Sequence, residues 1–143
     1  MKTASWILIA IAAGLTLLGG LVSLGVAYGS TRDQIGPASL GELSGASPGV
    51  GTAVRARRAT AAAYAAGFGT LLLAITLGPY RRGDLWAWWA ILAGVVVESV
   101  LSMLRVPFLG TRARAGPALL QLVVVGVGLA LGAGRLRGAD PPS

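Results

Sequence analysis

One carboxylate in this sequence stands where a carboxylate is energetically costly. Glu98 lies in the stretch GVVVESVLSMLR, residues 94–105, inside one of the most apolar parts of the chain. An ionisable side chain within a membrane-spanning helix costs at least ~2.5–3.5 kcal/mol on insertion scales, so it is expected to face a bundle interior and to have partners there. Glu98 is therefore the first candidate for chemistry, as an ion-coupling residue, an acid–base group or a polar lock.

The residues that share a helix face with Glu98 are small or polar. Gly94, Glu98, Ser102 and Arg105 recur at spacings of four, four and three, which places them on one side of a helix. Arg105 is about 10 Å from Glu98 along the helix axis, so a pairing between them would pass through Ser102 or a water. If the helix is rotated by a third of a turn, Ser99 takes the place of Ser102.

Every predicted helix contributes one hydrogen-bonding side chain at a similar depth. Counted from the side opposite to the termini, these side chains lie about 8–10 Å below the surface. They are Ser23, Tyr64, Glu98 and Gln121. The sequence therefore predicts a buried polar layer, a ligand-binding site or a structural lock, with Ser102 and Arg105 beside it. Its mouth would be rimmed by Arg57, Arg58 and Arg105.

Four apolar segments could position this layer. They cover residues 5–28, 59–78, 85–104 and 117–134, and about 20 helical residues cross a bilayer core. The first exceeds the 7–15 apolar residues of a signal peptide, so we expect a retained helix. The predicted fold class is all-α, an integral membrane four-helix transmembrane bundle that forms a single membrane domain over residues 1–143.

The segments between and after these helices are polar. Residues 29–58 are rich in Gly, Ser and Pro and are predicted to be a long polar loop, with room for a short surface helix around residues 40–43. Residues 105–116 are predicted to be a basic loop, and residues 135–143 a polar tail. Pro79 is expected to end the second helix, because proline cannot continue the hydrogen-bond ladder of a helix interior.

The composition excludes several classes of function. The chain has 143 residues, 55% of them hydrophobic and only 12% charged, with no cysteine and no histidine. Thiolate chemistry, His-based triads and Cys or His metal ligation are therefore excluded, and no second carboxylate lies near Glu98. We expect no catalytic residue, no metal site and no cofactor. The net charge of +7 comes from basic residues at the ends of apolar runs, where they contact lipid head groups rather than nucleic acid.

The basic residues do not select one orientation or one assembly of the protein. Five Lys and Arg residues fall on the side of the termini and seven on the other side, a weak bias under the positive-inside rule. One topology and an antiparallel dual-topology homodimer are both compatible with these counts. The aromatic residues are one-sided, because Trp6, Tyr80, Trp86, Trp88 and Trp89 all map to the termini side as an expected interfacial belt. Small residues at spacing four predict close helix packing. They are Ala59, Ala63 and Gly67, then Gly25 and Gly29, and Gly128 and Gly132.

Residues 54–105 carry a family resemblance. The stretches VRARRATAAAYAAGFGTLLLAI and YRRGDLWAWWAIL resemble small four-helix bacterial membrane proteins of the DoxX-like group, whose function is unknown. The resemblance implies a four-helix bundle in the bacterial inner membrane, multi-pass, with cytoplasmic termini. It implies no residue-level function.

The leading functional prediction is a non-enzymatic one. We expect an accessory protein, or one that binds a lipid or small amphiphile, with a polar layer around Glu98. Membrane lipids are the expected partners, and a homodimer or a larger membrane complex is left open. The alternative is an oligomeric transporter or channel that uses Glu98. A third class, a lipid-modifying enzyme, would need Tyr64 or Arg105 as a second functional group beside Glu98.

Overall fold

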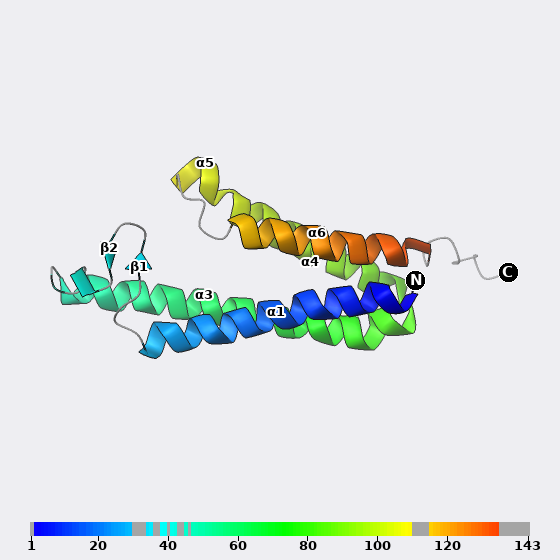
Figure 1. Ribbon diagram of the computed structural model, residues 1–143, viewed down its shortest axis with the longest axis horizontal. Coiled ribbons are helices and arrows are strands. Elements are labelled where there is room, and N and C mark those ends of the chain that lie inside the picture. Colours follow the sequence, from blue (N-terminus) through cyan, green and yellow to red (C-terminus); the bar gives the residue numbers. More distant parts are fainter. Residues whose placement is uncertain are drawn as a thin grey trace. The chain divides into compact units, whose positions relative to one another are not determined.

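The computed structural model describes residues 2–29, 34–35, 38–39, 41–42, 45, 47–109 and 115–134. Nearly all of these residues are helical, as Figure 1 shows. The helices are α1 (Lys2–Gly29), α3 (Pro48–Ile75), the π-helix η1 (Thr76–Tyr80), α4 (Leu85–Met103), α5 (Arg105–Leu109) and α6 (Ala115–Gly132). Two short strands, β1 (Gln34–Ile35) and β2 (Ala38–Ser39), pair in antiparallel register. The predicted helical architecture is thus confirmed for this part of the chain.

Three helices among these residues are long and apolar enough to cross a membrane. They cover Thr3–Gly29, Gly49–Tyr80 and Leu85–Phe108. A fourth apolar helix, Gly116–Gly132, is shorter. Long apolar helices suit lipid because all their backbone groups are satisfied within the helix.

The second long helix begins earlier than predicted. The expected bounds were 59–78, with residues 29–58 as a loop, but α3 already starts at Pro48. The Ser47 carbonyl accepts hydrogen bonds from the N–H groups of Val50 at 3.0 Å and Gly51 at 3.4 Å. Pro48 stands in the first turn, where proline's missing N–H has no intrahelical partner to lose. The Gly, Ser and Pro content of residues 29–58 therefore indicated a loop at a position where α3 begins.

The same helix also ends later than predicted. Pro79 does not stop it but lies inside η1, and the helical turns continue to Arg82. The end is set by Gly83, which has a φ of 101°. Its N–H donates to the Tyr80 carbonyl at 3.1 Å, and the N–H of Asp84 donates to the Pro79 carbonyl at 3.0 Å. These two bonds form a Schellman motif, which satisfies the last carbonyls of a helix.

The predicted loop 105–116 is also partly helical. Residues 105–109 form α5, and the Phe108 N–H donates to the Leu104 carbonyl at 3.3 Å across the junction with α4. Residues 110–114 and the predicted tail 135–143 lie outside the described residues. Of the predicted surface helix around 40–43, residues 41 and 42 are helical and residues 40 and 43 lie outside the described part.

The chain divides into two compact units, and α1 and α3 each contribute residues to both of them. The first unit comprises Met1–Ala13 and Leu71–Ser143, and the second comprises Gly14–Thr70. In the first unit α4 packs along α6. The buried face of α4 repeats every four residues, at Ala87, Ile91, Val95 and Ser99. In the second unit, α1 and α3 run antiparallel and side by side (Figure 1).

Candidate functional site

Glu98 lies half-buried on α4 in the first unit. The Ser102 hydroxyl donates a hydrogen bond to its Oε1 at 3.1 Å, so the carboxylate and its neighbour one turn on are joined along the helix. The other oxygen, Oε2, is buried and has no hydrogen-bond partner among the described residues. The carboxylate is therefore only half satisfied, which marks it as a group with unused capacity to bind.

The other predicted members of the polar layer are distributed over both units. Ser99 rather than Ser102 stands on the most buried stripe of α4, at 1% exposure. Gln121 is half-buried on α6, in the same unit as Glu98. The Arg105 side chain lies outside the described part of the structure.

Ser23 and Tyr64 belong to the second unit. Ser23 is buried as expected for the layer, but Tyr64 is 76% exposed. The buried position expected for Tyr64 is therefore wrong, because residue 64 falls on an open side of α3. That Ser23, Glu98 and Gln121 share one depth stays a prediction.

The second unit contains an open groove between α1 and α3. Its volume is about 860 Å³, within the range typical of ligand pockets. We refer to it as the α1–α3 groove. It is lined by Leu24, Ala27, Tyr28, Thr52, Arg55, Ala56, Ala59, Thr60, Ala63 and Tyr64.

The groove follows from how the two helices pack. They approach closely at Gly20, where an added Cβ would lie 2.6 Å from the Ala66 backbone nitrogen. Beyond Gly20, the small side chains of α3 and Ala27 of α1 leave space between the helices, and Ala27 and Ala59 are buried at its floor. Tyr28 and Tyr64 line it as well, although both side chains remain mostly exposed. The α1–α3 groove therefore has an alanine floor and tyrosine side chains along its edges.

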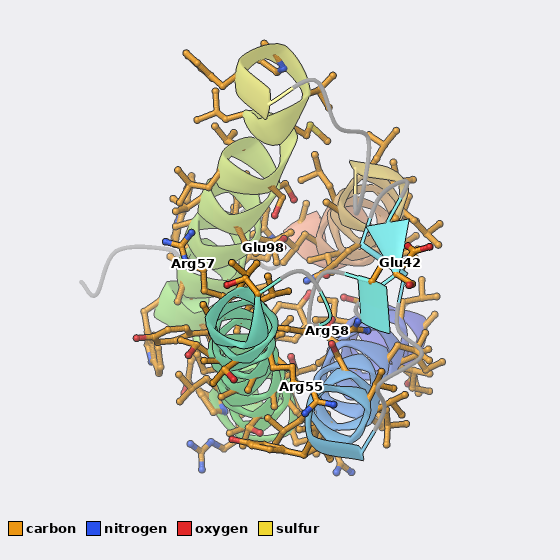
Figure 2. All side chains as sticks on the ribbon, turned by 90° about the vertical axis from the view of Figure 1, so that its left-hand side faces the viewer. Glu42, Arg55, Arg57, Arg58 and Glu98 are labelled. Carbon is orange, nitrogen blue, oxygen red and sulfur yellow. The ribbon has the colours of Figure 1, made fainter. Side chains whose placement is uncertain are left out.

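One end of the groove is basic. Arg55 lines it, and Figure 2 shows Arg55 and Arg58 leaving α3 on the side of α1, whereas Arg57 leaves on the opposite side. The groove is a different feature from the predicted mouth of the Glu98 layer, so the expectation that Arg57 and Arg58 rim that mouth stays a prediction. Arg55 was missed, although its spacing of three from Arg58 places the two on one helix face.

A second group of polar contacts lies in the first unit, near the chain's N-terminus. The Ser5 hydroxyl is 2.6 Å from the Tyr80 hydroxyl and donates to the Gly128 carbonyl at 2.7 Å. The Trp88 indole N–H donates to the Leu129 carbonyl at 3.1 Å. We refer to these residues, with Gly132, as the Ser5–Tyr80 cluster. Its bonds join α1, η1, α4 and α6.

Close packing at two glycines holds this cluster together. A Cβ at Gly132 would overlap the Tyr80 hydroxyl and lie 2.8 Å from Ser5 Oγ, and one at Gly128 would lie 2.7 Å from Ile9. The close approach predicted from the spacing of Gly128 and Gly132 is confirmed. The close approach predicted at Gly25, Gly29 and Gly67 is wrong for the described residues, because an added Cβ there would meet nothing within 4 Å. Tyr80, however, is fully buried, so its predicted place in an interfacial aromatic belt is wrong.

The other aromatic residues of that predicted belt are more accessible. Trp86 and Trp89 are exposed, and the Arg81 guanidinium lies 5.0 Å from the Trp6 ring centroid. A cation over an aromatic face is a favourable electrostatic contact. Trp86 and Trp89 therefore remain accessible, whereas Tyr80 does not.

Comparison of the chain with protein families, with curated proteins and with solved structures finds no match.

Proposed function

We propose that this chain is a multi-pass protein of the bacterial inner membrane, with α6 as a fourth span and both termini on the cytoplasmic side. The lengths of the helices support this. Between Arg58 and Arg81 lie 22 residues without a charge, about 33 Å of helix, which matches a hydrocarbon core of about 30 Å. The described part of α6 is nearer the short limit of a span. Large exposed apolar side chains, such as Leu15, Leu18 and Val22 on α1, would contact acyl chains.

Within the membrane the protein acts, in this proposal, as a non-enzymatic binder of a lipid or small amphiphile. The observation that carries this function is the α1–α3 groove, which combines an alanine floor, two exposed tyrosines and an arginine at one end. An elongated apolar ligand with a polar end fits that order of groups. A role as an accessory subunit of a larger complex is compatible with it. The proposal includes a relationship to the DoxX-like proteins, which residues 54–105 resemble.

A transporter or channel is the second candidate. It is favoured by the Glu98 Oε2 atom, which is buried without a hydrogen-bond partner among the described residues, as expected for a carboxylate that binds and releases an ion or proton. A homodimer would supply a second copy of this group. A lipid-modifying enzyme would need a second functional group beside Glu98 and has no such geometric support in the described residues.

Native mass spectrometry of the detergent-purified protein separates these functions. We expect the wild type to retain a lipid, Tyr64→Ala to lose most of it and Glu98→Gln to keep it. Phe108→Ala is the matched control, since Phe108 is an exposed aromatic residue on α5, outside the groove. If Glu98→Gln loses the ligand or a dimer while Tyr64→Ala does not, the transporter is favoured. A wild type that carries no lipid would contradict the proposed function.

A further inference from the structure

We infer that the α1–α3 groove selects a phosphate-bearing acidic membrane lipid, with its head group at Arg55 and an acyl chain along the alanine floor toward Tyr64. This inference rests on the proposed function and adds the class of lipid to it. The order of groups along the groove is the first argument. Arg55 and Thr52 stand at one end and Ala63 and Tyr64 at the other, so the charged side chain of the lining is separated from the far end by about 14 Å along α3, from residue 55 to residue 64.

The second argument is charge. Residues 47–64 contain three arginines and no acidic residue, so the polar end of the groove lies in a positive stretch of helix. A guanidinium presents a planar fork of N–H donors that matches phosphate oxygens in two parallel hydrogen bonds. Such charge-assisted bonds are about twice as strong as neutral ones. A phosphate therefore complements this end better than an uncharged head group does.

The third argument is depth in the bilayer. In the second unit α1 meets α3 at Gly20, opposite Ala62 and Ala66. Because the helices are antiparallel, nine residues onward along α1 reaches Gly29 at about the level of Arg55. The apolar run of α1 ends there, so Arg55 stands at the boundary between acyl chains and head groups. Arginines at this boundary attract anionic lipids by about 1 kcal/mol each.

A pair of matched variants tests the head group. The protein is reconstituted in nanodiscs of equal phosphatidylglycerol and phosphatidylcholine, and the lipids retained after purification are counted by native mass spectrometry. The wild type should retain phosphatidylglycerol over phosphatidylcholine by about fivefold, which corresponds to one basic residue's attraction. Arg55→Gln should bring this ratio close to one. Arg57→Gln removes the same charge only two residues further along α3, on the face turned from α1. It should therefore keep the wild-type ratio.

Each other outcome has a distinct meaning. Equal loss of selectivity in Arg55→Gln and Arg57→Gln would assign it to general surface charge and overturn the inference. Equal retention of both lipids by the wild type would overturn the inference and leave the proposed function standing. Retention of neither lipid would contradict the proposed function itself. Displacement of the lipid by excess inorganic phosphate would show that the site takes a free anion, which also overturns the inference.

Discussion

The Ser5–Tyr80 cluster and the α1–α3 groove are built from similar residues and have opposite character. Each combines small residues on packed helices with tyrosine and with hydroxyl groups. Tyr80 in the cluster is completely buried, whereas Tyr64 in the groove is 76% exposed. The cluster joins four helical segments, and the groove is formed by two.

The number of helices that meet accounts for this difference. In the cluster, the space left by Gly128 and Gly132 on α6 is filled by Ile9 and Ser5 of α1 and by Tyr80 of η1. In the groove, the space beside Ala59 and Ala63 lies between two helices and remains open. Small residues permit the close approach of helices in lipid. The space beside them is filled only where a further segment supplies a side chain of its own. The same composition therefore gives a structural joint in one unit and an open groove in the other.

The largest effect is expected from closing the space at Gly132. Gly132→Ala places a methyl group on the Tyr80 hydroxyl and against Ser5 Oγ, and overpacking with loss of a buried hydrogen bond should lower the free energy of unfolding by about 3 kcal/mol. Gly126→Ala on the same helix is the control. Nothing lies within 4 Å of its Cβ position, so alanine should leave stability unchanged or raise it by up to ~1 kcal/mol. Unfolding titrations in mixed micelles measure both, and equal stabilities would refute the joint.

The spacing of Gly128 and Gly132 predicted this contact, but not its partners. Recurrence at four residues reports that one helix face is small, whereas the choice of neighbouring helix depends on packing over the whole unit. Tyr80 illustrates the limit. Its place after an apolar run is typical of an interfacial residue, and only the path of η1 brings its hydroxyl to Ser5.

The helices and the site were predictable to different degrees. Apolar length predicted α1, α4 and α6 to within three residues at each end, because an uninterrupted apolar run marks the extent of such a helix. It did not predict the start of α3 at Pro48, where composition and helix-start signals conflict. Glu98 was singled out from its place in an apolar run, and one of its oxygens is buried without a hydrogen-bond partner among the described residues. Its bond to Ser102 depends on a side-chain rotamer.

A smaller effect on folding, with a clear effect on binding, is expected from filling the groove. Ala63 lines it and is exposed, so Ala63→Leu should change the free energy of unfolding by less than about 0.5 kcal/mol, as surface substitutions do. It should lower lipid occupancy about tenfold, which corresponds to roughly 1.4 kcal/mol. Ala61→Leu is the control, because Ala61 is exposed on α3 but does not line the groove. Unchanged occupancy in Ala63→Leu would place the lipid elsewhere.

The smallest effect concerns the connection that leads into α3. The Ser39 backbone N–H donates to Glu42 Oε2 at 2.8 Å, and the Glu42 N–H donates to Ser39 Oγ at 3.2 Å, a reciprocal capping box. These bonds hold the pKa of Glu42 below its ordinary value of 4.5, with the backbone bond as the larger cause and the Ser39 side chain as the smaller. Because the folded pKa is lowered, the contact is fully formed above pH 4.5 and is lost as the pH falls through the lowered value.

Carbon-detected NMR of the Glu42 carboxyl, with the Ser39 amide shift as a second probe, measures this titration directly. Ser39→Ala removes the hydroxyl and keeps the backbone donor, so it should raise the pKa of Glu42 only part of the way to the ordinary value. Glu42 is fully exposed and does not line the α1–α3 groove. Its protonation should therefore leave the free energy of unfolding and the lipid occupancy of the groove unchanged. A pKa at the ordinary value would contradict the capping box. A loss of bound lipid at the pH of this titration would instead show that the Ser39–Glu42 connection affects the α1–α3 groove.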